Sequence, residues 1–447
     1  MILDRHSFGI WSFVAKRAFK TTFRRPEPHS AKEAIKETLR GKREIGIYIH
    51  IPFCERFCTY CAYVRYLARD PDLISRYIEA LKAEIGTYGE LLRDLNLKIA
   101  HIHVGGGTPS LLDGSQFKEI SNSLTKCFGS HPGIAIEANP NDLVNKEKAF
   151  ELVNHGVGDV SLGVQSFNPD TLRRLGRPHG VEESLQAIEN LRRAGARHIN
   201  MDLMYMVPGQ SLGKWVEDLE QAAEQDVDEI TCYPTLITEH CPGFKLIKKG
   251  RVNQPDKRTF RRMVYAAEDI LSSKGFKPVE IYGYSRDPEW KYATVNYEME
   301  GPLLGLGCGA MGFTGGYEYQ NTCSVQEYIQ SALQGDLPIA GARSVDIEEL
   351  AIRYTNSRLL VSRSLDIRDF EERFGDFSEL IGKSGFGKML MLLRFLGYIK
   401  KREGKMELER RGLFTAHLIC WAFVTNVPCG IAREFLKTPW PNEVTIP

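Results

Sequence analysis

Short apolar runs alternate with amphipathic helical stretches from about residue 44 to residue 236, and this alternation limits the fold more than any other feature. The pattern predicts strands at 45–49, 99–104, 134–137, 159–164, 199–203 and 229–233, separated by helices at 73–92, 116–126, 146–154, 181–194 and 212–225. Strands that alternate with helices form a parallel sheet with right-handed crossovers. Polar residues gather near the carboxyl ends of these strands, which favours a partial (β/α)6 barrel within the α/β class.

The regular alternation ends near Pro242, and 447 residues exceed the length of one ordinary domain. We therefore expect an N-terminal extension over 1–43, the partial barrel over 44–240, a barrel-covering segment with a glycine-rich turn over 241–344, and a C-terminal α+β region over 345–447. In the last region, a helix near 388–396 is followed by a basic turn at 400–405 and an apolar strand. This order resembles a winged-helix unit.

The charge balance excludes a chain-wide polyanion binder, because 58 Lys and Arg residues face 57 Asp and Glu residues. Nucleic acid is therefore not the expected partner, although the C-terminal basic hairpin keeps RNA as an alternative. Ten cysteines in 447 residues are too sparse for a disulfide scaffold. A reduced compartment, the cytoplasm, is the expected location.

Both ends of the chain contain apolar residues that need an explanation. Charged residues interrupt the apolar residues of 1–25, so this segment is neither a signal peptide nor a membrane span. It is predicted to pack on the main domain, and the alternative is peripheral contact with the inner face of the membrane. The apolar run at 413–427 is shorter than the ~20 residues that a spanning helix needs, so we expect a buried helix.

Three cysteines, Cys54, Cys58 and Cys61, follow the first predicted strand with the spacing C-x3-C-x2-C. Three thiolates on one loop can bind three irons of a [4Fe–4S] cluster and leave the fourth iron open to another ligand. A zinc site of these cysteines with His50 is the alternative. Zinc sites commonly have a second pair of ligands at a separate position, and the chain has no second cysteine pair. The spacing therefore favours the cluster.

Polar and glycine residues follow several of the other predicted strands. The glycines at 105–107 would let the backbone approach a ligand closely and offer N–H groups to it, although tight turns use glycines too. Glu137 closes a strand, where it could bind an ammonium group or a ribose hydroxyl, or form a surface salt bridge. Gln165, Arg177 and Asp202 are expected at or just past strand ends, where they would face the mouth of the barrel.

The cysteine loop after the first strand of a partial barrel resembles the radical S-adenosylmethionine (SAM) superfamily. The segments IHIPFC, GGGTPSLL, IEANP, LGVQSF, LRRLGRPH and MDLMYMVPGQ resemble its oxygen-independent coproporphyrinogen III oxidase subgroup, over about residues 44–410. That subgroup includes haem chaperones, anaerobic haem-opening methyltransferases and class C radical SAM methyltransferases.

The resemblance implies roles for particular residues. The three cysteines would hold the cluster and act in catalysis together with Tyr60. Arg177 would bind the carboxylate of SAM, and Asp202 and Gln165 its ribose. Two SAM molecules are implied, and their contacts would come from Tyr48, Tyr60, Gly106, Gly107, Thr108, Glu137, Gln165, Arg177, Asp202, Pro234 and Met311.

Two departures from the subgroup shape the functional expectation. Tyr63 stands where the oxidases carry a further cysteine, and Val295 stands where haem chaperones carry a histidine. We therefore expect a two-SAM radical methyltransferase that acts on an sp2 carbon of a hydrophobic aromatic substrate, with a quinone such as menaquinone as the first guess. The alternative is a porphyrin- or haem-handling protein: an anaerobic haem-degrading methyltransferase, an oxidase or a chaperone.

Two further components of this chemistry are expected. Reduction of the cluster would need a low-potential electron donor of the flavodoxin or ferredoxin type. The candidates for the general base are Glu280, Tyr282, Tyr284 and Glu298, and the sequence does not choose among them.

Overall fold

The computed structural model describes residues 21–235, 237, 241–249, 253, 255–287, 301–426 and 442–446. Val295 and Glu298 lie outside the described residues, as do residues 1–20 of the N-terminal extension and the last residue of the apolar run at 413–427.

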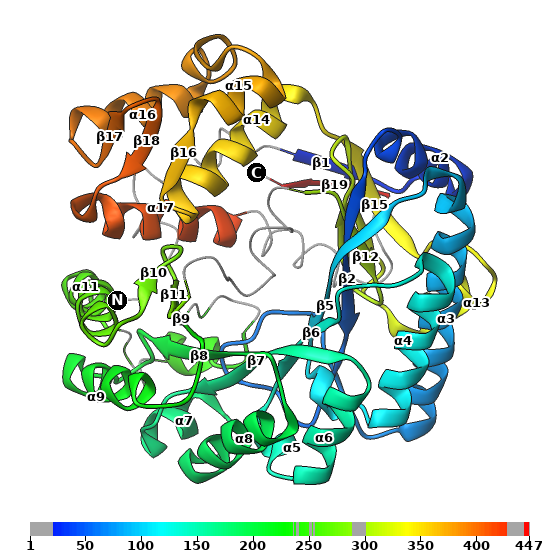
Figure 1. Cartoon of the computed structure of the whole chain (residues 1–447), viewed down its shortest axis with the longest axis horizontal. Coiled ribbons are helices and arrows are strands. Elements are labelled where there is room, and N and C mark those ends of the chain that lie inside the picture. Colours follow the sequence, from blue (N-terminus) through cyan, green and yellow to red (C-terminus); the bar gives the residue numbers. More distant parts are fainter. Residues whose placement is uncertain are drawn as a thin grey trace.

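The six predicted strands are present and lie parallel, each beside the next in chain order. Figure 1 shows them following one another along a curved sheet. The α/β prediction is confirmed. The strands are β2 (Glu44–Ile51), β5 (Lys98–Gly106), β6 (Ile134–Ala138), β7 (Val157–Gln165), β8 (His198–Tyr205) and β9 (Glu229–Pro234).

The five predicted helices also form, and they cover the outer side of the curved sheet (Figure 1). Local chemistry starts them: the Asp70 side chain accepts hydrogen bonds from two backbone N–H groups of the first turn of α3, and Asp113 forms a capping box with Gln116 in α4. The helices are α3 (Pro71–Leu92), α4 (Gly114–Phe128), α6 (Lys146–Asn154), α8 (Val181–Ala194) and α9 (Leu212–Ala223), with the short α5 (Pro140–Leu143) and α7 (Pro169–Leu175) between them.

The segment expected to cover the barrel also extends the sheet at both edges. β12 (Leu303–Leu306) lies parallel to β2, and β11 (Gly283–Ser285) lies antiparallel to β9. Fourteen described strands form this sheet. The others are β10 (Lys277–Pro278) beside β11, and beyond β12 come β13 (Met311–Phe313), β14 (Tyr317–Asn321), β15 (Ile339–Ser344), β1 (Thr21–Arg24) and β19 (Glu443–Ile446).

The described residues of the chain form four more helices in this part of the fold. They are α2 (Pro28–Leu39), α10 (Phe244–Lys248), α11 (Lys257–Ser273) and α13 (Val325–Leu333). The sequence pattern over 257–274 predicts a helix, which α11 confirms, whereas α13 was not predicted. That helix begins at Ser324, whose side chain caps it by accepting from Glu327 N.

The C-terminal elements follow the order expected of a winged-helix-like unit. They run α14 (Ile347–Thr355), β16 (Ser364–Asp366), α15 (Ile367–Phe374), α16 (Gly385–Phe395), β17 (Ile399–Arg402) and β18 (Lys405–Leu408). The three strands form a separate small sheet with β18 in the middle.

Helix α17 (Leu413–Asn426) confirms the helix predicted over the apolar run. Phe414 packs edge to face on Phe260 of α11, and His417 lies 3.4 Å from the hydroxyl of Tyr205 at the end of β8. The helix therefore packs against the barrel strands and their outer layer. Across the part of the chain that the structure describes, no helix is long and apolar enough to cross a membrane.

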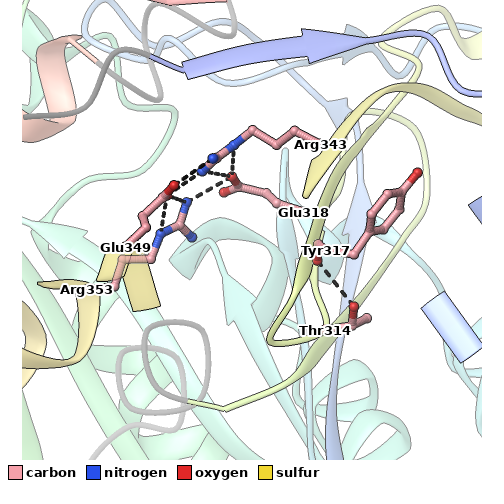
Figure 2. Close-up of polar contacts among 6 residues, drawn as sticks. All are labelled: Thr314, Tyr317, Glu318, Arg343, Glu349 and Arg353. Atoms are coloured by element: carbon pink, nitrogen blue, oxygen red, sulfur yellow. Dashed lines mark hydrogen bonds and ion pairs between the residues drawn. The ribbon is translucent and has the colours of Figure 1, made fainter. Parts of the chain in front are cut away.

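Four charged side chains join the C-terminal unit to the sheet (Figure 2). Arg343 of β15 donates through Nε to Glu318 of β14 at 2.7 Å and through Nη1 to Glu349 of α14 at 2.7 Å. Arg353 of α14 donates to Glu318 at 2.8 Å and to Glu349 at 3.0 Å. Arg343 and Glu318 are only 9% exposed, so each charge depends on its partners rather than on water.

Glu84, a fully buried carboxyl on α3, holds the turn that follows β12. It accepts hydrogen bonds from Gly307 N at 2.8 Å, Tyr328 Oη at 2.7 Å and Asn321 Nδ2 at 2.9 Å. Burial raises the pKa of Glu84 from 4.5 to about 7, and the three donors oppose that rise. Hydrogen bonds to the single carboxyl group of Glu84 thus join α3 to this turn and to α13.

Replacing Arg343 by Met should lower the free energy of unfolding by about 3–5 kcal/mol, because the buried Glu318 and the partly buried Glu349 lose a shared partner. Urea unfolding measures this loss. Arg193→Met is the control, since it removes an exposed helix pair with Glu189 and should cost about 0.5 kcal/mol or less. Equal losses in the two variants would contradict a structural role for the four-charge cluster.

The raised pKa of Glu84 predicts that its contribution to stability falls as the pH rises. The folded state binds the proton more tightly than the unfolded state, whose pKa stays near 4.5, so the loss develops between about pH 4.5 and 7. Glu84→Gln should flatten the pH dependence of unfolding free energy by about 3 kcal/mol over this range. Glu189→Gln, at an exposed position, should leave the slope unchanged; the same slope in both variants would contradict the prediction.

Candidate functional site

The cysteine loop begins where β2 ends. Cys54 closes the short strand β3 (Phe53–Cys54), which pairs with β4 (Tyr66–Leu67), and Cys58 and Cys61 lie on the loop between these strands. Cys54 is buried, and the other two thiols are partly buried. Burial raises the pKa of Cys61 to about 11 and also raises that of Cys54, so neither thiol is ionised on its own at neutral pH.

Two segments distant in sequence hold this loop. Thr59 donates through its hydroxyl to Arg174 O at 2.8 Å, and Gly243 N donates to Thr59 O at 2.7 Å. The thiol of Cys241 donates to Tyr60 O at 2.9 Å. A Cβ at position 243 would lie 2.9 Å from Thr59 O, so glycine permits this contact. The sequence analysis did not identify Cys241 or Gly243, because short-range spacing carries no signal for such long-range contacts.

Arg177 lies at the centre of the site. Its Nη1 is 3.5 Å from Cys58 Sγ and 3.4 Å from Tyr60 Oη, and its Nη2 donates to Gly163 O at 3.0 Å and to Asn139 Oδ1. Burial opposes the charge, but the neighbouring Tyr60 and Cys58 raise the pKa of Arg177. Its Nε is buried and has no hydrogen-bond partner among the residues that the structure describes. The guanidinium therefore joins the cysteine loop to the ends of β6 and β7 and retains one unused donor.

Arg177 reaches the site differently from the sequence-based expectation. It was placed at or just past a strand end, whereas it follows α7 by two residues. Gly163 gives it room, because a Cβ there would lie 3.0 Å from Nη2. Asn139, directly after β6, was not predicted as a site residue, although its place after a strand end is the kind of signal used for Gln165.

The glycine-rich segment packs against the cysteine loop. Gly106 has φ +112° and donates its N–H to Glu137 Oε2 at 3.2 Å. Thr108 N donates to Phe53 O at 2.8 Å, and a Cβ at Gly107 would lie 2.6 Å from the same oxygen. The N–H groups of residues 106–108 thus donate hydrogen bonds within the protein. They were expected to be offered to a ligand. The side chain of Thr108 hydrogen-bonds the thiol of Cys54.

Asp202 belongs to a buried polar cluster on three neighbouring strands. It lies in β8, three residues before the strand ends, and is therefore deeper than expected. Ser161 Oγ and Asn200 Nδ2 donate to its two carboxylate oxygens at 2.9 and 3.0 Å, and Thr231 Oγ1 donates to Asn200 Oδ1 at 2.8 Å. Burial raises the pKa of Asp202 to about 7. Ser161, Asn200 and Thr231 were not predicted as site residues. The available signal was a polar residue within a predicted apolar strand.

Gln165, the last residue of β7, is buried with φ +68°. A residue other than glycine seldom adopts a backbone conformation with positive φ, and such strained residues are concentrated at functional sites. Pro234 is the last residue of β9, and Met311 begins β13 beyond β12. In the sheet order, β9 and β12 are separated by the five strands β8, β7, β6, β5 and β2. These two residues therefore lie far apart along the sheet.

The partly buried Tyr48 and the buried His50 form a hydrogen-bonded pair on β2. Tyr48 Oη lies 2.9 Å from His50 Nδ1, and His50 Nε2 lies 3.0 Å from Val64 O. Burial lowers the pKa of His50 to about 4, so the ring is neutral. Both ring nitrogens are engaged, which argues against His50 as the fourth ligand of a zinc site. The ring of Tyr48 packs on His103, 5.4 Å between centroids.

Three of the four candidate bases are described, and Tyr282 and Tyr284 lie near the last barrel strand. Tyr282 packs on Tyr233 of β9, with 5.8 Å between ring centroids, and burial raises the pKa of both Tyr282 and Tyr284 well above the usual value. Both phenols therefore keep their protons at neutral pH, and neither is a general base in that state. Glu280 is buried, and Glu298 lies outside the described residues.

The residues present fit an iron–sulfur cluster with a SAM-like ligand. The donor set consists of soft thiols, which suit iron–sulfur clusters. A guanidinium with an unused Nε suits a carboxylate. In the residues that the structure describes, no three His, Cys, Asp or Glu side chains are grouped to hold a single metal ion.

Comparison with known proteins identifies the family. The model of the radical SAM superfamily matches residues 48–222. Heme chaperone HemW of Bacillus subtilis is 26% identical over 380 residues, which cover 84% of this chain and 98% of that protein. Oxygen-independent coproporphyrinogen III oxidase of Bradyrhizobium diazoefficiens is 28% identical over 358 residues, covering 76% of this chain and 78% of that protein.

A solved structure extends the likeness to the fold. Coproporphyrinogen III oxidase from Escherichia coli superposes with a TM-score of 0.77 at 22% identity, covering 90% of this chain and 94% of that one. The match therefore includes most of the C-terminal unit as well as the barrel.

These relatives overturn the methyltransferase prediction and its quinone substrate. Their names are those of haem chaperones and coproporphyrinogen oxidases. The prediction rested on elimination: Tyr63 and Val295 were taken to weigh against the oxidase and the chaperone, which were kept as the alternative, and no residue supported methyl transfer directly. The relatives favour that alternative. Departures at two positions are weaker evidence about function than an alignment over 380 residues. The chain belongs to the radical SAM superfamily, whose members use a [4Fe–4S] cluster and SAM, in the subgroup of coproporphyrinogen III oxidases and haem chaperones.

Proposed function

We propose that this chain is a porphyrin-handling protein of the haem-chaperone type, built on a radical SAM core. The observation that carries the proposal is the alignment with a haem chaperone over 98% of that protein's length. Such an alignment spans both the barrel and the C-terminal unit. The Tyr233–Tyr282 pair supports it, because aromatic faces suit a flat macrocycle and Tyr233 is 39% exposed.

Cys54, Cys58 and Cys61 would hold the cluster, which when bound supplies an electron for cleavage of SAM. Arg177 would bind the carboxylate of SAM through its unused Nε while its other nitrogens keep the cysteine loop on the strand ends. Asp202 would accept ribose hydroxyls with the lone pairs that Ser161 and Asn200 leave free.

Three details belong to this proposal alone. Two SAM molecules would bind, as in the family resemblance, with Gln165 and Glu137 contributing beside Arg177. A flavodoxin- or ferredoxin-type protein would supply the electron, and the location would be the cytoplasm.

A coproporphyrinogen oxidase-like activity is the second candidate. The TM-score of 0.77 with the Escherichia coli oxidase and the Bradyrhizobium relative favour it. Tyr63, which is 70% exposed beside the cysteine loop, stands against it, because the oxidases carry a cysteine there.

Haem titration separates the two candidates. The chain, reconstituted without oxygen, should bind about one haem with a shifted Soret band, and this binding should not require cleavage of SAM. Parallel reactions with coproporphyrinogen III, SAM and a reductant follow porphyrinogen products and 5′-deoxyadenosine by mass spectrometry. Oxidised porphyrinogen with no stable haem binding would overturn the chaperone proposal in favour of the oxidase.

Cluster binding should depend on the loop cysteines. Replacing Cys54, Cys58 and Cys61 together by Ala should abolish iron and acid-labile sulfide incorporation, because the irons lose their thiolate ligands. Iron analysis and electron paramagnetic resonance of the reduced protein measure this. Cys127→Ala, the same change on α4, should retain the full cluster, and loss of the cluster in that control would point to general misfolding instead.

Arg177→Lys should retain the cluster but weaken SAM binding by about 100-fold, since an ammonium group cannot reproduce the forked contacts of the guanidinium. Anaerobic calorimetry with SAM measures the dissociation constant, and iron content is followed in parallel. Arg173→Lys is the control, because its side chain is 77% exposed. Unchanged SAM affinity in Arg177→Lys would remove this residue from the SAM site.

A further inference from the structure

Helix α16 is apolar on two opposite faces. One face is buried in the C-terminal unit through Phe386, Met389, Leu390 and Leu393. On the other side, Phe395 is 87% exposed, Met391 56%, and Leu392 and the following Leu396 40% each. A helix with apolar residues all round is normally covered on both sides. Four large apolar side chains within six residues form a patch of the kind that marks an interaction site.

The surroundings of this patch carry positive charge. From Lys383 to Arg402 the sequence has six Lys and Arg residues and no Asp or Glu. Lys400 and Arg402 pair with Glu409 at 3.1 and 3.0 Å. Lys388, Arg394 and Lys401 are exposed, and they make no ion pair with the residues that the structure describes. The patch is therefore apolar at its centre with unneutralised cations around it.

A shallow hollow of about 540 Å³ lies between the end of α16 and β17. Met391 and Phe395 contribute its apolar wall, and Arg394 and Lys401 contribute positive charge. An anionic group could enter this hollow beside the exposed ring of Phe395.

The side chains on the exposed face of α16 favour a lipid bilayer over nucleic acid as the binding partner. In a winged-helix unit, α16 occupies the place of the helix that would read nucleic acid, but from Gly385 to Leu396 it has no Ser, Thr, Asn or Gln to bind base edges or phosphates. Long apolar and aromatic side chains flanked by Lys and Arg are typical of surfaces that lie in the headgroup region of a bilayer. Cations close to that surface strengthen binding to anionic lipid.

We propose that α16 and the β17–β18 hairpin form a surface that binds an anionic lipid bilayer. Phe395, Met391, Leu392 and Leu396 insert among the acyl chains near the headgroups, and Lys388, Arg394 and Lys401 contact anionic phosphates. The C-terminal unit thus docks the protein on a membrane without a spanning helix.

Co-sedimentation of the full-length, cluster-containing protein with vesicles tests this proposal. One set of vesicles contains phosphatidylcholine and phosphatidylglycerol, and the other contains phosphatidylcholine alone. Binding should be stronger to the anionic set and should weaken in high salt. Met391→Glu with Phe395→Glu should lower the partition coefficient at least tenfold, and Arg394→Gln with Lys401→Gln should lower it roughly fivefold for each cation removed.

Matched controls make the same chemical changes elsewhere. Leu333→Glu alters a 56% exposed apolar residue on α13, and Lys118→Gln with Lys126→Gln removes two exposed cations from α4. Both controls should bind vesicles like the unaltered protein. Circular dichroism and thermal unfolding check that every variant is folded.

Three outcomes would overturn the proposal. Absence of binding to anionic vesicles is the first, and vesicle binding that the α16 variants leave unchanged is the second. The third is that Met391→Glu with Phe395→Glu abolishes self-association or RNA binding, measured by analytical ultracentrifugation and filter binding, without changing vesicle binding.

Discussion

The hydrogen bonds of the Arg177 guanidinium are the interactions on which the rest of the site is centred. It touches Cys58 and Tyr60 on the cysteine loop and donates to Gly163 O and Asn139 at the ends of two barrel strands. A loop with three thiols has little secondary structure of its own to set their positions. One planar cation with several donors in fixed directions can contact the loop and the sheet and still offer a donor to a carboxylate, which an ammonium group cannot do in the same geometry.

The remainder of the architecture supports this arrangement from outside. Glu84 ties α3 to the turn after β12, and the backbone of Thr108 binds the strand that leads into the cysteine loop. Gly243 and Cys241 hold the loop from the other side. Together with the contacts of Thr59 to residues 174–175, the loop is therefore held by hydrogen bonds to three segments of the chain.

The functional assignment shows how reasoning from absent residues can fail. Tyr63 and Val295 were weighed against the oxidase and the chaperone, which became the second choice, and methyl transfer was placed first without a residue that required it. A cofactor site shared by many chemistries constrains the reaction only weakly, because the substrate is recognised by groups outside it. The likeness to haem chaperones and coproporphyrinogen oxidases extends over most of the chain and carries more information than two positions.

The amino-acid sequence by itself determined the six parallel strands, the helices between them, the cysteine loop and the family, because periodicity and spacing are local properties of the chain. It also indicated the winged-helix order and the apolar helix α17. Only the tertiary structure decided that Arg177 reaches the site from α7, that Ser161, Asn200 and Thr231 surround Asp202, and that α16 exposes Phe395. These facts depend on which distant segments meet, and burial and long-range contact are set by the packing of the whole chain.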